Sequence, residues 1–249
     1  MSTAHKFIFI SGGTRGIGRE IALSLAQRGR TLFLNYLRDD VSAAKVKSQA
    51  GKKGARVILL RGNIGDEDAV RSLLDAVQKE TKHLDALIHC AALGVFKPVH
   101  QLRVKDWNIS LDVNAKAFLL LTQAALPLMK KNGGRIIAIS SLGAQRFTPH
   151  YGAIGISKSA LENLVRYLAV ELAHYKISVN AVSGGLVETD SVKMFPHWES
   201  MKKEYLSRTP GRRIGRPEDI ARVVSFLLSP QSDWIYGQTL IADGGYSLV

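Results

Sequence analysis

Short apolar runs alternate with longer segments of helical periodicity along the whole chain, and this alternation constrains the fold more than any other feature. The apolar runs lie at residues 7–10, 31–35, 57–60, 84–89, 135–139, 177–182 and 240–241. Helical patterns lie between them, at residues 41–53, 66–82 and 104–130 and in the segments after Lys158 and Pro217. Strands that alternate with helices form a parallel sheet with right-handed crossovers. We therefore predict an α/β fold, a doubly wound parallel sheet of about seven strands with helices on both faces.

Length and composition agree with a single domain. The 249 residues contain no internal repeat, low-complexity run or flexible linker, so we predict one domain over residues 1–249. Hydrophobic residues make up 46% of the chain, enough for a sizeable core. Cys90 is the single cysteine and excludes an internal disulfide. Residues 1–6 are polar, and no apolar run approaches the length of a membrane span, so we expect a soluble cytoplasmic protein.

The net charge of +13 implies attraction to an acidic partner. The basic residues include scattered pairs rather than one dense tract, namely Lys52-Lys53, Lys130-Lys131, Lys202-Lys203 and Arg212-Arg213. No zinc-finger or aromatic RNA-binding motif accompanies them, so we expect neither a nucleic-acid nor a membrane partner. A basic surface that serves only solubility is the alternative.

A glycine-rich turn follows the first apolar run. Its glycines, Gly12, Gly16 and Gly18, have the spacing Gly-x3-Gly-x-Gly, and a helical pattern begins behind them. Such glycines let the backbone turn tightly and let a phosphate approach the amide groups of a helix N-terminus. Between a first strand and a first helix, this turn indicates a dinucleotide site in a Rossmann-type sheet.

The end of the second apolar run favours NADPH over NADH. An NAD site carries an acidic residue there to hold the ribose 2′-hydroxyl, whereas a 2′-phosphate is bound by arginine. Tyr36 occupies the position of the acid, and Arg15 and Arg38 can both converge on it. Two solvated surface arginines are the alternative. Asp39 and Asp40 follow at once, and a small shift in register would bring a carboxylate to the site.

The junction between the fifth apolar run and the next helix carries hydroxyls, a phenol and an amine. In an open α/β sheet, ligands bind at the carboxyl ends of the strands. Tyr151 and Lys158 are seven residues apart, so a continuous helix would place them on nearly one face, about 10 Å apart along its axis. We expect the Lys158 ammonium to lower the pKa of Tyr151. A half-buried tyrosine and a surface lysine are the ordinary alternative.

Residues 190–210 mix apolar and aromatic side chains with lysines. The apolar and aromatic members include Met194, Phe195, Pro196, Trp198 and Tyr205. Such a segment suits a mobile lid over an apolar substrate. A plain helical hairpin on the surface is an equal alternative.

Over essentially its whole length, the chain resembles the short-chain dehydrogenase/reductase family. Five motifs occur in the family's order: the turn at 12–18, Asn114, the Ser-Tyr-Lys series at 141–158, the turn at 184–189 and the tail at 243–245. The resemblance implies NAD(P)(H)-dependent hydride transfer by a catalytic set of Asn114, Ser141, Tyr151 and Lys158. It implies a metal-free cofactor site made of Gly12, Thr14, Arg15, Gly16, Ile17, Gly18, Tyr36, Arg38, Asn63, Ile64, Cys90, Ala91, Ala92, Tyr151, Lys158, Gly185, Val187 and Thr189.

The chain departs from the commonest members of that family at several positions. Their tyrosine and lysine are four residues apart, whereas the interval here is seven, as in enoyl-acyl-carrier-protein reductases. Their Asn-Asn-Ala-Gly is His-Cys-Ala-Ala at 89–92, and their Pro-Gly is Gly-Gly at 184–185. With Ser-Ser-Leu-Gly at 140–143, the chain is similar to the FabL-like, NADPH-dependent third type of bacterial enoyl-acyl-carrier-protein reductase. This similarity implies fatty acid synthesis, a substrate bound to acyl carrier protein, and a homotetramer or homodimer.

The seven-residue interval has a chemical rationale. Ketone reduction delivers hydride to the carbon that bears the protonated oxygen, whereas enoyl reduction delivers it to Cβ, while negative charge develops on the thioester oxygen. The phenol must then lie farther from the nicotinamide, and three extra residues move it by about 4.5 Å along an ideal helix. We therefore predict NADPH-dependent reduction of trans-2-enoyl thioesters, with Tyr151 hydrogen-bonded to the enolate oxygen and Lys158 on the ribose.

Several alternatives stay open at the level of sequence. Ser140 competes with Ser141 as a second donor, because the serine loop is short. Asn114 either holds a water near Lys158, as in the family, or satisfies a helix kink. A reductase of 3-oxoacyl thioesters or other carbonyls is the enzymatic rival. A Rossmann protein that senses NADPH or binds nucleic acid is the non-enzymatic one.

Overall fold

Seven parallel strands form one sheet in the computed structural model, which describes residues 6–194 and 198–249. The strands are β1 (Phe7–Ser11), β2 (Thr31–Tyr36), β3 (Arg56–Arg61), β4 (Ala86–His89), β5 (Gly134–Ser141), β6 (Ile177–Gly184) and β7 (Thr239–Ala242). Their order across the sheet is β3-β2-β1-β4-β5-β6-β7, so the direction of strand addition reverses between β1 and β4. This confirms the predicted doubly wound sheet, whose ligand site is expected at that reversal.

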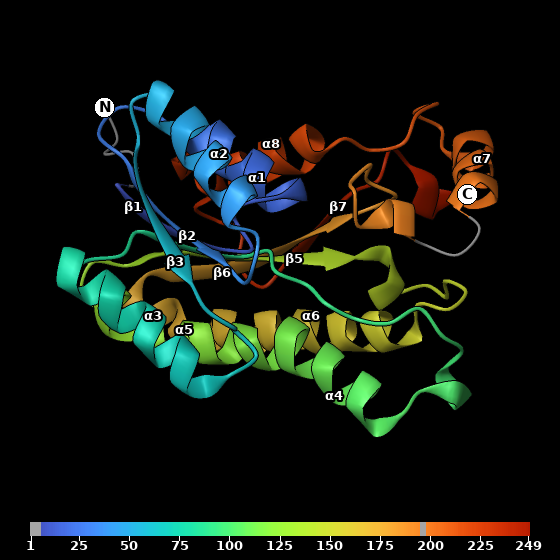
Figure 1. The fold of residues 1–249 in the computed structure, drawn as a ribbon, viewed down its shortest axis with the longest axis horizontal. Helices are drawn as coiled ribbons and strands as arrows, with labels where there is room; N and C mark the ends of the chain where they lie inside the picture. Colours follow the sequence, from blue (N-terminus) through green and yellow to red (C-terminus); the bar gives the residue numbers. More distant parts are fainter. Residues whose placement is uncertain (1–5, 195–197) are drawn as a thin grey trace.

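Helices cover both faces of the sheet (Figure 1). One layer contains α1 (Gly16–Leu25), α2 (Asp40–Lys52) and α8 (Pro217–Leu227). The other contains α3 (Glu67–Glu80), α4 (Val104–Leu111), α5 (Ala117–Met129) and α6 (Gly152–Leu172). Helix α7 (Trp198–Arg208) lies apart from both layers, beside the C-terminus (Figure 1).

Side chains of the central strands alternate between two cores. Phe9 of β1 packs with α3, α5 and α6, whereas its neighbours Ile8 and Ile10 pack with α1, α2 and α8. All three are fully buried. Because both faces of the sheet are covered, each strand is a continuous apolar run rather than an alternating pattern. This is why short apolar runs located the strands.

Strand bounds differ from the sequence-based ones where polar residues continue the ladder. The sixth strand continues to Gly184, because Ser183 pairs with Ser140 and Gly184 pairs with Ser141. The fourth strand is shorter than predicted and begins at Ala86. Backbone pairing, rather than apolar character, therefore sets the strand ends at the carboxyl edge.

The helix predicted over residues 104–130 is interrupted. A π-helical turn, Asp112–Lys116, separates α4 from α5, and such turns are frequent at functional sites. By length and hydropathy alone, the helical segment Val104–Met129 could cross a membrane, with mean hydropathy 1.2 over an 18-residue window, although charged residues such as Asp112 and Lys116 interrupt its apolar run. Phe118 and Leu121 of this segment are fully buried in the core, which accounts for its apolar character.

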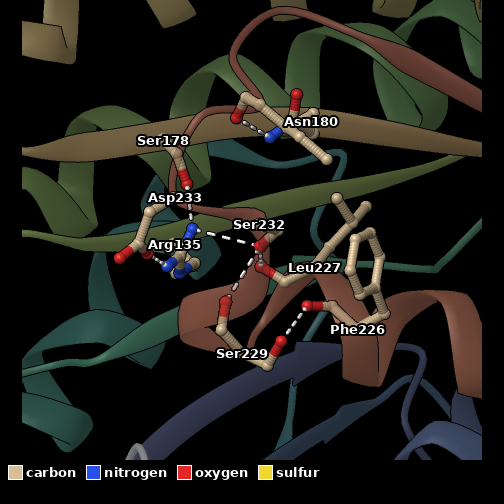
Figure 2. Close-up of polar contacts among 9 residues, drawn as sticks. Arg135, Ser178, Asn180, Phe226, Leu227, Ser229, Ser232 and Asp233 are labelled. Atoms are coloured by element: carbon tan, nitrogen blue, oxygen red, sulfur yellow. Dashed lines mark hydrogen bonds and ion pairs between the residues drawn. The ribbon is translucent and has the colours of Figure 1, made fainter.

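A polar network joins β5, β6 and the segment after α8 at the amino edge of the sheet (Figure 2). Arg135 Nη1 donates to the hydroxyl oxygens of Ser178 at 3.2 Å and Ser232 at 3.3 Å. The same guanidinium forms an ion pair with Asp233. Ser232 donates in turn to the carbonyl oxygen of Leu227 at 2.9 Å. The network ties the C-terminal part of the chain to the centre of the sheet.

Candidate active site

The glycine-rich turn lies between β1 and α1, where backbone segments approach too closely for side chains. Gly12 has φ of +63°, and an added Cβ would lie 2.8 Å from the Cα of Ala91. An added Cβ at Gly18 would lie 2.2 Å from the carbonyl oxygen of Gly12. Gly16, with φ of +53°, faces the methyl group of Thr189. The turn thus brings together the ends of β1 and β4 and the loop after β6.

The first turn of α1 suits an anion. The helix begins at Gly16 with no acidic residue in its first turn, and its N-cap residue Arg15 makes no side-chain capping hydrogen bond. Amide groups in a first helical turn have no intrahelical partner, and the helix dipole favours a negative charge beside them. Together with the close approach at Gly12, this arrangement fits the pyrophosphate of a dinucleotide.

Ser11 and His89 hold the turn in place, and neither was singled out from the sequence as a functional residue. Ser11 Oγ lies 2.9 Å from His89 Nδ1 and accepts hydrogen bonds from the amides of Cys90 and Ala91. His89 Nε2 lies 3.2 Å from the carbonyl oxygen of Asn114. Burial lowers the pKa of His89 to about 3, so its ring is neutral, with Nε2 donating and Nδ1 accepting. The sequence signal that could have revealed this role was His89, which stands where the family has asparagine.

The two acids after β2 are engaged by other groups. Asp39 caps α2 and accepts from the amide of Ser42 at 2.9 Å and from its hydroxyl at 2.6 Å. Asp40 accepts from the hydroxyl of Tyr36 at 2.7 Å, which raises the pKa of that phenol, and pairs with Arg61 at 3.5 Å. These contacts compete with any role for either carboxylate at a ribose hydroxyl.

Arg15 and Arg38 lie exposed near the same strand end. Hydrogen bonds from Ser42 lower the pKa of Asp39, and the charge of Arg15 adds to this effect. Arg15 therefore acts on the segment after β2 from the glycine-rich turn, while Arg38 belongs to that segment itself. Two cations at this place suit a 2′-phosphate.

The two serines at the end of β5 have different partners. Ser140 is buried and donates to Oε1 of Glu162 at 2.6 Å. Ser141 accepts from the amide of Gly143 at 3.3 Å and is hydrogen-bonded to Tyr151, where it favours the ionised phenol. Of the two candidates, the geometry therefore favours Ser141 as the partner of Tyr151.

Tyr151 precedes α6 rather than lying within it. It is the N-cap residue, with φ of −102° and ψ of 5°, and its carbonyl oxygen accepts from the amide of Gly155 at 2.8 Å. Burial raises the pKa of Tyr151, and the hydrogen bond from Ser141 opposes this effect. The expectation that Lys158 lowers this pKa is wrong, because desolvation of the phenol is the largest effect.

Lys158 is 3% exposed on the second turn of α6. Its Nζ donates to the carbonyl oxygen of Ile139 at 2.7 Å. Burial lowers its pKa to about 8, while Cys90 and Glu162 act in the opposite direction. An ammonium has three donors, and the described residues use one of them, so two can serve the hydroxyls of a ribose.

Asn114 lies in the π turn and reaches across to neighbouring segments. Its Nδ2 donates to the carbonyl oxygen of Leu93 at 3.0 Å and to the hydroxyl of Ser157 at 2.8 Å. Its Oδ1 accepts from the amide of Leu93 at 2.9 Å. Its partners lie in the loop after β4 and in α6, so the side chain links the π turn to these two segments rather than satisfying the backbone of the helix kink, and a water held near Lys158 stays a prediction.

The other predicted cofactor residues follow strands at the same edge or belong to the glycine turn. They are Thr14, Ile17, Asn63, Ile64, Cys90, Ala92, Gly185 and Val187. An added Cβ at Gly185 would lie 2.9 Å from the Cβ of Asp243, so the tail at 243–245 packs against this loop. Their contact with a cofactor stays a prediction. No group of three His, Cys, Asp or Glu side chains that could hold a metal occurs in the described ranges.

Helix α7 is held by the C-terminal segment rather than by an apolar face. The rings of Tyr205 and Tyr246 stack with centroids 3.9 Å apart and planes 10° apart. Arg208 lies 5.0 Å from the Tyr246 ring centroid and donates to the carbonyl oxygen of Val249 at 2.8 Å. Aromatic stacking and a cation over a ring each contribute modestly to stability.

Helix α7 also adjoins the phenol of Tyr151, as expected if residues 190–210 form a lid. Burial and Tyr246 raise the pKa of Tyr205, and the charge of Tyr151 adds to this effect. Phe195 and Pro196 of the predicted lid lie outside the described residues. The mobility of this segment stays a prediction.

The chain is similar to several known reductases and dehydrogenases. A family model described as enoyl-(acyl carrier protein) reductase matches residues 12–247. The chain is 39% identical to 1-cyclohexenylcarbonyl-CoA reductase of Streptomyces collinus, across 96% of this chain and 86% of that protein. It is 34% identical to the hydroxynaphthalene reductase-like protein Arp2 of Metarhizium acridum, across 98% and 96% of the two chains.

The chain is also similar to a solved dehydrogenase structure. The 7α-hydroxysteroid dehydrogenase complexed with NADH and 7-oxo glycochenodeoxycholic acid superposes with a TM-score of 0.91 at 32% identity. The match covers 96% of this chain and 93% of that one. Fold and sequence thus agree with the site geometry on a nicotinamide-dependent dehydrogenase or reductase.

Proposed function

The chain belongs to the short-chain dehydrogenase/reductase family of nicotinamide-dependent oxidoreductases, and from this premise we propose that it reduces the C=C bond of trans-2-enoyl thioesters with NADPH. The observation that carries the proposal is the interval between Tyr151, at the N-cap of α6, and Lys158, two turns inside it. The family model described as enoyl-(acyl carrier protein) reductase supports it. So does the Streptomyces collinus relative, whose name specifies a C=C bond conjugated to a thioester.

The glycine turn and its neighbours are the proposed cofactor site. When bound, NADPH supplies the hydride. The amides around Gly16 hold the pyrophosphate, and Arg15 and Arg38 hold the 2′-phosphate, since Asp39 and Asp40 are engaged with other groups. Lys158 holds the nicotinamide ribose through the donors that Ile139 leaves available.

Tyr151 is the proposed hydrogen-bond donor to the enolate oxygen. Its raised pKa keeps the proton on the phenol near neutral pH, so the group donates rather than accepts. Ser141, hydrogen-bonded to the same phenol, orients it. Stabilisation of an oxyanion by a positioned donor commonly contributes a few kcal/mol to the transition state.

Carbonyl reduction is the second candidate, favoured by particular relatives. The hydroxynaphthalene reductase-like protein is 34% identical to this chain, and the hydroxysteroid dehydrogenase structure holds a 7-oxo ligand. In that chemistry the protonated oxygen is on the carbon that receives hydride. The phenol would then have to lie closer to the nicotinamide than we propose from the seven-residue interval.

The charge and surface of the chain extend the proposal to partners. A net charge of +13 suits a substrate carried by acidic acyl carrier protein in cytoplasmic fatty acid synthesis, since charges at the rim of an interface mainly raise the association rate. Trp234 is 97% exposed and Val170 is 79% exposed, which supports a homotetramer or homodimer that covers such side chains.

Oxidation of NADPH with crotonyl and acetoacetyl thioesters, measured side by side, tests the proposal. We expect kcat/KM to be at least about tenfold higher for the crotonyl thioester, because the phenol is set for the thioester oxygen. A preference for the acetoacetyl thioester would replace the enoyl proposal by the carbonyl one.

A further inference from the structure

Glu162 is a buried carboxylate on α6, one helical turn after Lys158. The residue is 5% exposed. Its Oε1 accepts from the hydroxyl of Ser140 at 2.6 Å, and its Oε2 accepts from the side-chain amide of Gln145 at 3.1 Å. Both oxygens of the carboxylate thus have a hydrogen-bond donor. A charge that is costly to bury is thus kept beside the candidate site.

The donors to Glu162 belong to the segment that carries the catalytic hydroxyls. Ser140 directly precedes Ser141, and Gln145 lies between Ser141 and Tyr151. The residue before Ser140, Ile139, supplies the carbonyl oxygen that accepts from Lys158. One carboxylate on α6 therefore connects the end of β5 and the following loop to the helix that carries the lysine.

The other titratable groups that act on Lys158 or lie near it are neutral near pH 7. At the end of β4, burial lowers the pKa of His89 to about 3 and raises that of Cys90 to about 12. At the start of α6, burial raises the pKa of Tyr151. Ser141 of β5 and Asn114 of the π turn carry no charge. Among the described residues, Glu162 therefore supplies the negative charge opposite the lysine.

We propose that Glu162 is a positioning residue of the reductase site, which holds the end of β5 against α6 and keeps the Lys158 side chain protonated at neutral pH. Its effect on turnover rests on the proposed function. Its effect on the charge of Lys158 does not, because that charge is a property of the protein without cofactor.

The charge is tested by titrating the lysines in protein labelled with ¹³C at Cε, without cofactor. The Lys158 signal is the one lost in Lys158→Arg, and in the wild type it should titrate near pH 8. In Glu162→Gln, which removes the charge at constant size, the midpoint should fall by at least about one pH unit. Glu171→Gln, exposed on the same helix, is the matched control and should leave it unchanged.

Positioning is tested separately with Glu162→Asp, which keeps the charge and draws the carboxylate back by one methylene. The Lys158 midpoint should stay close to that of the wild type, while kcat should fall at least about tenfold, because Ser140 and Gln145 lose their acceptor. This variant keeps a buried carboxylate, so it also serves if Glu162→Gln does not fold. Wild-type kcat in Glu162→Asp would overturn the positioning role.

An unchanged Lys158 midpoint in folded Glu162→Gln would overturn the charge role. A wild type that binds NADPH but reduces neither thioester would remove the proposed function alone. The lysine titration would still decide whether Glu162 sets the charge of Lys158.

Discussion

Two cations, the largely buried Arg135 at the amino edge of the sheet and the buried Lys158 at the carboxyl edge, are held in different ways. The side chain of Arg135 is 12% exposed, binds the hydroxyls of Ser178 and Ser232 and forms an ion pair with Asp233 (Figure 2). Lys158 is 3% exposed and, among the described residues, hydrogen-bonds only a backbone carbonyl oxygen. Arg135 is paired directly with a carboxylate, whereas Lys158 retains hydrogen-bond donors for a ligand.

This is the difference that we expect between a structural network and a functional one. A buried cation paired with a carboxylate and hydroxyls links chain segments, and removing it leaves those partners unsatisfied. A buried cation without a direct counter-charge has a perturbed pKa, and such groups gather at functional sites. Burial lowers the pKa of Lys158 to about 8, which fits a group that awaits a ligand.

The largest expected effect is on turnover, at the carboxyl edge. Tyr151→Phe keeps the ring and removes the hydroxyl, so kcat for enoyl reduction should fall by about 30-fold or more, equal to about 2 kcal/mol of transition-state stabilisation. NADPH binding, measured by fluorescence titration, should survive. Tyr167→Phe, on the exposed face of α6, is the control. Wild-type turnover in Tyr151→Phe would remove the phenol from the mechanism.

Matched methionine substitutions should change stability to different extents at the two edges. Arg135→Met should lower the free energy of unfolding by about 2 kcal/mol with kcat unchanged, because two hydroxyls lose their donor. Lys158→Met should abolish NADPH binding yet lower the free energy of unfolding at pH 7 by less than Arg135→Met does, because removing a charge that burial disfavours offsets part of the cost of leaving Glu162 without the lysine. Urea unfolding of both variants measures these changes in the free energy of unfolding. Equal destabilisation by both would mean that the two cations have the same role.

Acid sensitivity should come partly from His89. Its pKa is about 3 in the fold and about 6.5 when unfolded, so between these values only the unfolded chain binds the proton. Its stabilising contribution is therefore complete above pH 6.5. Below that, the free energy of unfolding should fall by about 1.4 kcal/mol per pH unit as the pH approaches 3. His89→Asn should flatten the dependence of unfolding free energy on pH, and the exposed His174→Asn should not. Identical slopes for all three proteins would contradict this.

The smallest expected effect concerns cofactor choice. The wild type should prefer NADPH over NADH by at least about tenfold in kcat/KM, since Arg15 and Arg38 adjoin a strand end whose acids are engaged. Arg38→Ala should reduce that preference with little effect on NADH, whereas the exposed Lys45→Ala should leave it intact. Equal use of both cofactors by the wild type would refute the assignment.

The fold was predictable because its determinants are local and repeated. A strand covered on both faces is a short apolar run, and each run in this chain is followed by turn residues or a helical pattern. The glycine turn was predictable for the same reason, since Gly12 and Gly18 are required where backbone segments touch. The family's motif order then placed Tyr151 and Lys158 at the same edge of the sheet.

The chemistry of the site was less predictable because it depends on burial and on distant partners. The pKa of Tyr151 follows from desolvation, which the seven-residue interval does not indicate. Ser141 is favoured as the partner of Tyr151 because Ser140 is hydrogen-bonded to Glu162, which lies 22 residues farther along the chain. The π turn at Asn114 interrupts a continuous apolar pattern, so periodicity alone predicted one helix.

The most direct test of enoyl reduction follows deuterium from [4-²H]NADPH into product when crotonyl and acetoacetyl thioesters compete in one mixture. Both substrates accept hydride at C3, so the product, rather than the labelled position, identifies the reaction. The seven-residue interval predicts that butyryl thioester carries nearly all the deuterium. If 3-hydroxybutyryl thioester carries most of it, the phenol serves a ketone oxygen, and the proposed role of Tyr151 at an enolate oxygen is contradicted.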